Sequence, residues 1–311
     1  MRIVFMGTPR AAVPTLQRCV ADGHEVVAVW TQPDRPAGRG HRVAFSPVKE
    51  FALSHGLQVF QPARLKNDEA LDLFASHGAD VAVVVAYGRI LPEKFLQTPR
   101  RGCINVHFSL LPLYRGAAPA NWAIVNGETE TGVTTMFLEP ALDTGPILLQ
   151  RTTPIGDTET APELMERLSE IGAELLGETL SRLGDLTPRP QRDRDATFAP
   201  ILKKEDGLID WSRSAIEIER CVRGFQPWPN AYTSFNSKGL TIWRAQSVSS
   251  AIPAVPGEVI AAHGDDLIVK CGWDTALRAI EVQLEGRKRM GARDFLNGVH
   301  VKVGDRFGRE A

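Results

Sequence analysis

Short apolar runs alternate with segments of helical periodicity along the first half of the chain. Each run is four to seven residues long, at 3–6, 25–31, 57–60, 81–86 and 103–107. This alternation is typical of right-handed βαβ units and predicts a parallel sheet. Residues 81–86 are apolar at every position, as expected for a central strand covered on both faces. Two further strands are expected at 132–138 and 147–152, and then a helix over 161–183.

The pattern changes between residues 185 and 206, where the chain becomes polar, charged and rich in proline. Such a stretch suits an exposed connector, so we expect a first domain over 1–188, a linker over 189–205 and a second domain over 206–311. After a helix at 214–222, the second domain has short β-like runs at 231–235, 241–245, 257–261, 266–271 and 279–283. These predict a small barrel or sandwich, which makes the fold class α/β with a Rossmann-like, mostly parallel first domain.

The composition is that of a soluble globular protein, with 43% hydrophobic and 23% charged residues among 311. The longest apolar run, 81–87, is far shorter than the roughly 20 residues that a membrane-spanning helix needs. The apolar stretch at 3–6 is cut by Gly7, Thr8 and Pro9, which makes it too short for a secretory signal. We therefore expect a protein with no membrane association.

Charge and cysteine usage limit the kinds of ligand site and the cellular compartment that we expect. Thirty-six basic and 37 acidic residues give a net charge of -1, so a nucleic acid would have to be bound by a local patch. The four cysteines, Cys19, Cys103, Cys221 and Cys271, are scattered without C-x-x-C pairs. This spacing indicates neither a zinc knuckle nor a disulfide framework, and it fits a reducing cytoplasm.

Two segments near the N-terminus are candidates for binding. The tripeptide Gly7-Thr8-Pro9 follows the first strand, but the G-x-G-x-x-G and P-loop spacings are absent. Thr8 as an N-cap with Pro9 at the first helical position explains it without a ligand. The loop 32–47 is long, and most of its charged residues are arginines, including Arg39 and Arg42. Arginine forks suit phosphates and stacked bases, so the loop is either a nucleic-acid contact or a solvated basic loop.

The strongest chemical candidates stand at a strand end. Asn105 and His107 alternate on the strand 103–107 and so share one face, near the carboxyl edge where parallel sheets place their sites. An amide donor beside an imidazole can stabilise an oxyanion and move a proton. Asp143 follows a later strand and is able to fix the imidazole tautomer and stabilise its charged form. By contrast, His55 and His77 each precede a glycine and are expected as helix C-terminal caps.

These residues belong to an ordered set of motifs that resembles the folate-dependent formyltransferases. The central motifs are Asn105-Val106-His107-x-Ser109-Leu110-Leu111-Pro112, Arg115-Gly116-Ala117-Ala118-Pro119, Thr131-Gly132-Val133-Thr134 and Leu142-Asp143-Thr144-Gly145. The flanking motifs resemble the branch that acts on methionyl-tRNA, and they include Gly7-Thr8-Pro9, residues 31–40, Ser46-Pro47-Val48-Lys49, residues 84–88, Ile209-Asp210-Trp211 and Pro227-Trp228-Pro229. The resemblance thus covers nearly the whole chain.

The resemblance implies formyl transfer from 10-formyltetrahydrofolate to the α-amine of initiator methionyl-tRNA, without a metal. It assigns catalysis to Asn105, His107 and Asp143, and it places Ser109, Leu110, Leu111 and Pro112 beside the folate. It also implies that the second domain is an OB-like barrel that helps to bind tRNA. Arg39 and Arg42 of the loop, and Arg287, Lys288 and Arg289 of the barrel, are then expected on the tRNA. We expect a monomer.

Three departures from the family pattern accompany this resemblance. Phe108 stands where a small residue is usual, Leu113-Tyr114 replaces a more polar pair, and His41-Arg42 stands where lysines are common. Because Phe108 should point away from His107, we expect altered packing and intact chemistry. The alternatives are a related formyltransferase or hydrolase acting on a small molecule, and a non-catalytic RNA-binding module. We also expect a fragment ending near residue 189 to contain the complete site.

Overall fold

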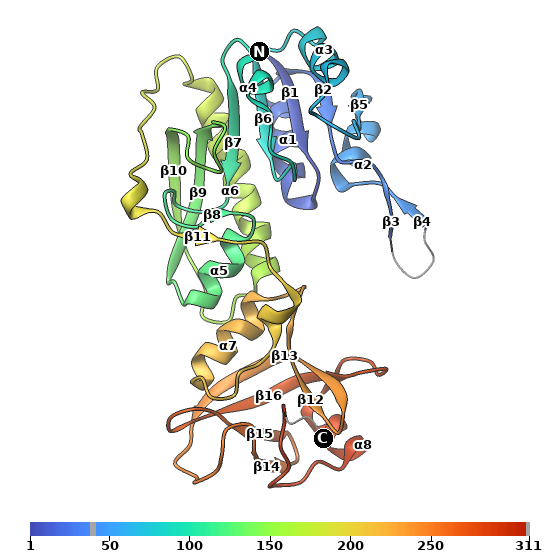
Figure 1. The fold of residues 1–311 in the computed structure, drawn as a ribbon, viewed down its shortest axis with the longest axis vertical. Helices are drawn as coiled ribbons and strands as arrows, with labels where there is room; N and C mark the ends of the chain where they lie inside the picture. The colour runs from blue at the N-terminus through green and yellow to red at the C-terminus, as the bar shows by residue number, and fades with distance from the viewer. Residues whose placement is uncertain (38–41, 309–311) are drawn as a thin grey trace. The chain divides into compact units, whose positions relative to one another are not determined.

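The chain forms two compact units, and each is assembled from three separate segments (Figure 1). The computed structural model describes residues 1–37 and 42–308, without the side chains of residues 35–37, 42 and 43. The first unit contains Met1–Pro119, Glu130–Pro154 and Met165–Ala199, and the second contains Ala120–Thr129, Ile155–Leu164 and the chain from Pro200 on. No helix in the described ranges is long and apolar enough to cross a membrane.

The first unit is built on a seven-stranded sheet. In spatial order its strands are β10 (Ile147–Pro154), β9 (Glu130–Phe137), β7 (Cys103–His107), β6 (Val81–Val85), β1 (Arg2–Gly7), β2 (Glu25–Trp30) and β5 (Val59–Phe60). The strands from β7 to β5 pair in parallel, which confirms the prediction from alternating periodicity. The strands β9 and β10 pair antiparallel and complete the other edge. All five residues of β6 are buried, as expected for a central strand.

Helices cover both faces of this sheet. They are α1 (Val13–Ala21), α2 (Pro47–Ser54), α3 (Asp68–Ser76), α4 (Glu93–Gln97) and α6 (Ala161–Ser181), with a 3₁₀ turn η1 at Arg10–Ala12. On one face, Trp30 of β2 packs edge-on against Phe74 of α3 and Phe95 of α4. His55 and His77 occupy the C-cap positions of α2 and α3, as predicted.

Two local predictions near the N-terminus were wrong. Thr8 does not cap a helix, because its hydroxyl donates to the Tyr87 carbonyl oxygen at 3.1 Å and the first α-helix begins only at Val13. Thr8 thereby joins the ends of β1 and β6. The segment 32–47 is also not free of regular structure, since β3 (Arg35–Ala37) and β4 (Arg42–Ala44) pair antiparallel within it. An apolar-periodicity argument cannot detect strands this short and polar.

Residues 189–199, which we call the strap, are attached to the first unit along their length. The backbone of Arg189 pairs with Ile147 at 2.8 Å in both directions. Further along, β11 (Phe198–Ala199) runs parallel to β8 (Arg115–Gly116), after a 3₁₀ turn η2 at Asp193–Asp195. The strap thus belongs to the first unit, and most of its residues are exposed, as the sequence predicts.

The second unit contains an antiparallel sheet. Its strands, in spatial order, are β12 (Ala231–Phe235), β13 (Lys238–Ser249), β16 (Thr275–Leu284), β15 (Asp266–Lys270) and β14 (Val259–His263), with the short β17 (Met290–Gly291) beside β16. Residues 305–308 bridge the two edges, because Phe307 N donates to Gly257 O and Gly308 N donates to Ser234 O, at 2.8 and 2.9 Å. These bonds close the sheet into the small barrel that the sequence predicts.

Helices of the second unit are α5 (Pro119–Asn126), which starts at the unit boundary, α7 (Ala215–Gly224) and α8 (Ala292–Val299), with a 3₁₀ turn η3 at Lys204–Gly207. Between α5 and α7, Gly224 has no room for a side chain, since a Cβ there would lie 2.5 Å from Val125. The Asn121 amide donates to the Gly224 carbonyl oxygen at 2.7 Å. The short segment 120–129 is therefore part of the second unit, although most of that unit comes from residues after Pro200.

Candidate functional site

The end of β7 presents two polar side chains on one face, as predicted. Asn105 and His107 are buried, with 8% and 6% of their surfaces exposed. The alternate residues Val106 and Phe108 face α6, because a Cβ on Gly172 would lie 2.9 Å from Val106 and 3.5 Å from Phe108. The expected orientation of Phe108 is thus confirmed, and the ring fills space against a helix. Its presence leaves the polar face of the strand unchanged.

Asp143 meets this face from the turn after β9. Its Oδ2 atom lies 3.7 Å from Nδ1 of His107 and accepts a 2.8 Å hydrogen bond from the Gly116 amide. The backbone of Asp143 has a positive φ of 53°, which non-glycine residues adopt at some cost. Two residues later the turn requires a glycine, since a Cβ on Gly145 would lie 1.9 Å from the Phe137 carbonyl oxygen. The turn is therefore shaped so as to place this carboxylate.

The imidazole of His107 has an oxygen on each side. Its Nε2 lies 3.0 Å from the backbone carbonyl oxygen of Tyr114. A carbonyl oxygen only accepts, so Nε2 carries the hydrogen and Nδ1 faces the carboxylate of Asp143. The Tyr114 carbonyl thus favours the tautomer with hydrogen on Nε2. When the ring is protonated, each of its N–H groups has an oxygen partner.

Asn105 differs from these residues in having an amide that is free to bind. Among the hydrogen bonds of residues 1–37 and 42–308, none involves its side chain, although the residue is 8% exposed. A buried polar group usually has a partner. An unused amide beside an oriented imidazole is what a carbonyl substrate would need as a donor for its developing oxyanion.

Two hydrogen bonds fix the loop from Ser109 to Pro112, and one of them goes to strand β9 of the sheet. The Ser109 hydroxyl donates to the Leu113 carbonyl oxygen at 2.6 Å, and the Leu111 amide donates to the hydroxyl of Thr134 at 3.1 Å. Ser109 and Leu111 are buried, whereas Leu110 and Pro112 are partly exposed. Of the four residues that the sequence places beside a folate, Leu110 and Pro112 have side-chain surface available to a ligand.

The predicted RNA contacts are spread over the chain. Arg39 lies outside the described residues, and Arg42 belongs to β4 with its side chain outside the description. Arg287, Lys288 and Arg289 lie exposed in the turn between β16 and β17, which we call the basic hairpin. Within it, Arg289 already pairs with Glu281 and lies 5.0 Å from the centre of the Trp243 ring. Arg287 and Lys288 are the side chains of this hairpin with the greater freedom to meet a phosphate.

The base of the segment 32–47 is anchored by an ion pair. The Lys49 ammonium lies 2.5 Å from Oδ2 of Asp34, and Gln61 donates to Oδ1 of the same carboxylate at 2.8 Å. Hydrogen bonds from Lys49 and then from Gln61 lower the pKa of Asp34. Sequence patterns alone did not reveal this cluster, which joins residues from 34 to 61. It fixes the point where the arginine-bearing segment leaves the sheet.

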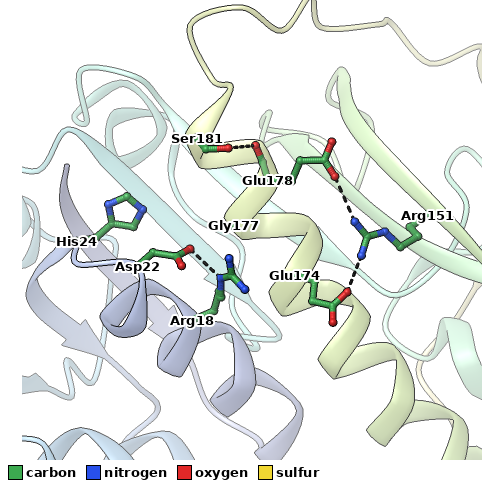
Figure 2. A pocket seen from close by; sticks show the side chains of 8 residues that line it. All are labelled: Arg18, Asp22, His24, Arg151, Glu174, Gly177, Glu178 and Ser181. Carbon is green, nitrogen blue, oxygen red and sulfur yellow. Dashed lines mark hydrogen bonds and ion pairs between the residues drawn. The ribbon is translucent and has the colours of Figure 1, made fainter.

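A cavity of about 610 Å³ lies beside α1 and α6, apart from the end of β7 (Figure 2). Figure 2 shows Arg18 paired with Asp22, and Arg151 held between Glu174 and Glu178. Gly177 allows the close approach of Arg18, since a Cβ there would lie 2.7 Å from its Nε. The arginines of this cavity are thus neutralised by their neighbours. The end of β7 differs from this cavity, because the Asn105 side chain there has no hydrogen-bond partner among the described residues.

Sequence reasoning missed the residues that hold the catalytic candidates in place. Tyr114 provides the acceptor for His107, and Thr197 accepts the Tyr114 amide at 2.9 Å. Gln191 donates to the carbonyl oxygens of Asp143 and Gly145, both at 2.8 Å. Thr197 and Gln191 lie in the strap, so a fragment ending near residue 189 would lack both. Only the polar character of the strap was visible in the sequence, and that signal is shared with ordinary connectors.

Comparison with known proteins is consistent with this geometry. Residues 1–180 match the family model for formyl transferase, and residues 201–300 match the model for the formyl transferase C-terminal domain. The chain is 51% identical over 307 residues to the methionyl-tRNA formyltransferase of Caldanaerobacter subterraneus subsp. tengcongensis, covering 98% of this chain and 99% of the relative. A second methionyl-tRNA formyltransferase, from Koribacter versatilis, is 52% identical over 312 residues and covers 99% of both chains.

A solved structure shows the same fold at much lower identity. The N-formyltransferase from Helicobacter canadensis, in complex with folinic acid and dTDP-3-aminofucose, superposes with a TM-score of 0.66 at 18% identity. The superposition covers 89% of this chain and 98% of that one. The likeness concerns the fold, and the identification depends on the close relatives and the two family models. The chain therefore belongs to the formyl transferase family, within its methionyl-tRNA formyltransferase branch.

Proposed function

We propose that the protein transfers the formyl group of 10-formyltetrahydrofolate to the α-amino group of initiator methionyl-tRNA, for the initiation of translation. The observation that carries the proposal is the gathering of Asn105, His107 and Asp143 at the end of β7, in a chain whose close relatives are methionyl-tRNA formyltransferases. We take the folate as a co-substrate and the cytoplasm as the place of reaction. All the catalytic candidates come from one chain, which fits a monomer.

The reaction needs three things from the protein. The neutral α-amine attacks the formyl carbon, forming a new C–N bond and a tetrahedral centre with a negatively charged oxygen. The bond between that carbon and N10 of the folate then breaks. The proton lost by the amine is transferred to N10, so the products are formylmethionyl-tRNA and tetrahydrofolate. The site must therefore stabilise an oxyanion, hold a charge nearby and move one proton.

The three residues divide these tasks. The Asn105 amide, which has no partner among the described residues, donates to the oxyanion. The imidazolium of His107 supplies positive charge, and its position is fixed by Tyr114 on one side and Asp143 on the other. The carboxylate of Asp143 keeps one oxygen for the Gly116 amide and takes part in moving the proton from the amine. None of these steps requires a metal ion.

The folate is expected along the loop that follows β7, in contact with Leu110 and Pro112. Ser109 and Leu111 support the shape of this loop from within, through their bonds to Leu113 and Thr134. Folate complexes of two fold neighbours, HypX from Aquifex aeolicus with tetrahydrofolic acid and WlaRD with 5-N-formyl-THF, support a folate as the formyl donor. The tRNA is expected to contact Arg39 and Arg42 of the segment 32–47 and the basic hairpin of the barrel.

An assay with separate substrates tests the proposal. Purified protein is incubated with 10-formyltetrahydrofolate and either methionyl initiator tRNA, the uncharged tRNA or an amino-sugar nucleotide. We expect formyl transfer to the charged tRNA alone. Transfer to the sugar nucleotide, or release of formate without an acceptor, would assign the chain to the small-molecule or hydrolytic alternative. Binding of tRNA without any turnover of the folate would assign it to the non-catalytic alternative.

A further inference from the structure

We propose that Gln191 of the strap is a positioning residue for catalysis, which holds the carboxylate of Asp143 at His107 without touching a substrate. The inference builds on the proposed function and extends it to a segment whose sequence suggests an exposed connector. Gln191 is separated from Asp143 by 48 residues along the chain. Gln191 connects the turn that bears Asp143 with β8, the strand whose Gly116 amide donates to the Asp143 carboxylate.

The amide nitrogen of Gln191 organises the backbone of the Asp143 turn. It donates to the carbonyl oxygen of Asp143 and to that of Gly145, in each case at 2.8 Å. Two carbonyl oxygens pointing at one place repel each other unless a donor stands between them. The NH₂ group has two hydrogens, so one side chain satisfies both acceptors. These bonds act on a backbone with a positive φ at Asp143, which needs such support.

The other end of the same amide is held by a buried arginine. The Gln191 Oε1 atom accepts from Nε and Nη2 of Arg115, at 3.0 and 2.8 Å. Arg115 is only 4% exposed, and its Nη1 pairs with Oδ1 of Asp193 at 2.9 Å. Charged donors make the stronger hydrogen bonds, so the orientation of the Gln191 amide is fixed. The Gln191 amide therefore points its oxygen toward Arg115 and its nitrogen toward the Asp143 turn, and this orientation gives both groups a hydrogen-bond partner.

Arg115 and Gly116 are neighbours, and this closes the arrangement into a ring. Gly116 donates its amide to Oδ2 of Asp143, while Arg115 holds the side chain that fixes the Asp143 backbone. The short strand β8 thus positions Asp143 in two ways. Gly116 bonds to its carboxylate, and Arg115 holds the Gln191 side chain that bonds to its backbone. Loss of Gln191 would leave the Gly116 bond as the main restraint. The distance from Asp143 to His107, already 3.7 Å, would then vary more widely.

Two substitutions separate positioning from simple structural support. Gln191→Met keeps the size and removes all the hydrogen bonds. Gln191→Glu keeps an acceptor for Arg115 but places a carboxylate oxygen against the two carbonyls of the turn. Gln97→Met serves as the control, because Gln97 lies on α4 and bonds only to Glu93 among the described residues. By analogy with residues that orient metal ligands, both Gln191 variants should lose roughly 10- to 100-fold in kcat, with each KM within about 2-fold.

A second measurement does not depend on activity. Native-state hydrogen exchange reports on the Gly116 amide, whose hydrogen is bonded to Asp143. We expect faster exchange at Gly116 in both Gln191 variants and no change in Gln97→Met. If Gln191→Met fails to fold, Gln191→Glu alone decides, since it retains the pairing with Arg115. A wild-type enzyme without activity would contradict the proposed function but leave the exchange test in place.

The proposal is overturned by either of two results in an active wild-type background. One is a Gln191→Glu variant with wild-type kcat, which would mean that only the contact with Arg115 matters. The other is a loss of thermal stability in Gln191→Met with unchanged kcat and unchanged exchange at Gly116. A fall in kcat together with faster Gly116 exchange supports it.

Discussion

The strand-end site and the basic hairpin use polar residues in opposite ways. In the first, Asn105, His107 and Asp143 are less than a tenth exposed, and backbone groups fix the orientation of His107 and Asp143. In the second, Arg287 and Lys288 are exposed on a turn. Bond-making requires atoms held within fractions of an ångström, whereas attraction to phosphates acts over a distance of several ångströms. The comparison predicts that changes in the first region act on kcat and changes in the second on the KM for tRNA.

The largest effect is expected from His107→Ala. The substitution removes the charge beside the reacting carbonyl and one of the groups that Asp143 faces. We expect kcat to fall by about 10²- to 10⁴-fold, the usual range for an acid–base group, while the KM for each substrate stays close to the wild-type value. Steady-state kinetics with both substrates varied measures this. Near-normal turnover would remove His107 from the mechanism.

A somewhat smaller loss is expected from Asn105→Ala, because it deletes one donor to the oxyanion. The loss in kcat should be about 10²- to 10³-fold. Asn105→Asp is the matched variant, since it keeps the shape of the side chain and replaces the donor with an acceptor. It should be at least as inactive as the alanine variant. If only KM changed in either variant, Asn105 would bind substrate equally in the ground and transition states.

The hairpin should respond differently. Replacing Arg287 and Lys288 together with alanine should raise the KM for tRNA several-fold and leave kcat and the folate KM unchanged. Each lost phosphate contact should reduce the slope of log affinity against log salt by roughly 0.7 to 0.9. Lys302→Ala is the control, because Lys302 is an exposed basic residue of the same unit outside the hairpin. An unchanged salt slope would show that the hairpin is an ordinary solvated turn.

The smallest effect concerns the stability of the second unit. Glu217 closes a capping box at the start of α7, and hydrogen bonds from Ser214 and then Arg213 lower its pKa to about 2. A lowered carboxyl pKa stabilises the fold above the unfolded-state value of 4.5, and the contribution is lost as the pH falls toward 2. Glu217→Gln should therefore cost about 1 kcal/mol near neutral pH, as for other helix caps.

The same substitution should cost almost nothing near pH 2. Chemical denaturation at a series of pH values gives the difference between variant and wild type. A difference that did not shrink between pH 4.5 and 2 would assign the stabilisation to packing and not to charge. Because the capping box belongs to the second unit and β7 to the first, kcat should not change.

Local sequence was sufficient for the strands and for the face of β7. The bounds Cys103–His107 were predicted to the residue, and alternation alone put Asn105 and His107 on the same side. Asp143 was proposed only as a carboxylate on a turn after another strand, and that strand, β9, runs antiparallel to β7, so sequence alone did not place it beside His107. The predictions that failed concern very short strands and contacts between residues that are distant in the sequence. The strands β3 and β4 have three residues each, and Thr8 bonds to Tyr87 across 79 positions.

The strap was missed for the same physical reason. Its polar residues satisfy buried partners 48 to 83 positions away, as Gln191 does for Asp143 and Thr197 for Tyr114. In sequence, a polar residue that bonds to a buried group is identical to one that bonds to water. Only the burial of the partner distinguishes them, and burial follows from the assembled fold. A chemical motif can thus be recognised while the residues that orient it remain hidden.

The strap also limits how these enzymes can be recombined. A hybrid gene joined at the change in composition, after residue 188, would combine one parent's Asp143 turn with another parent's Gln191 and Thr197. For parents that differ at these contacts, we expect hybrids in which the Asp143 carboxylate is held less tightly. A junction after Ala199 keeps each turn with the strap of the same parent. Even then the hybrid inherits a foreign segment 120–129, which packs within the second unit, so the natural unit of exchange is discontinuous along the gene.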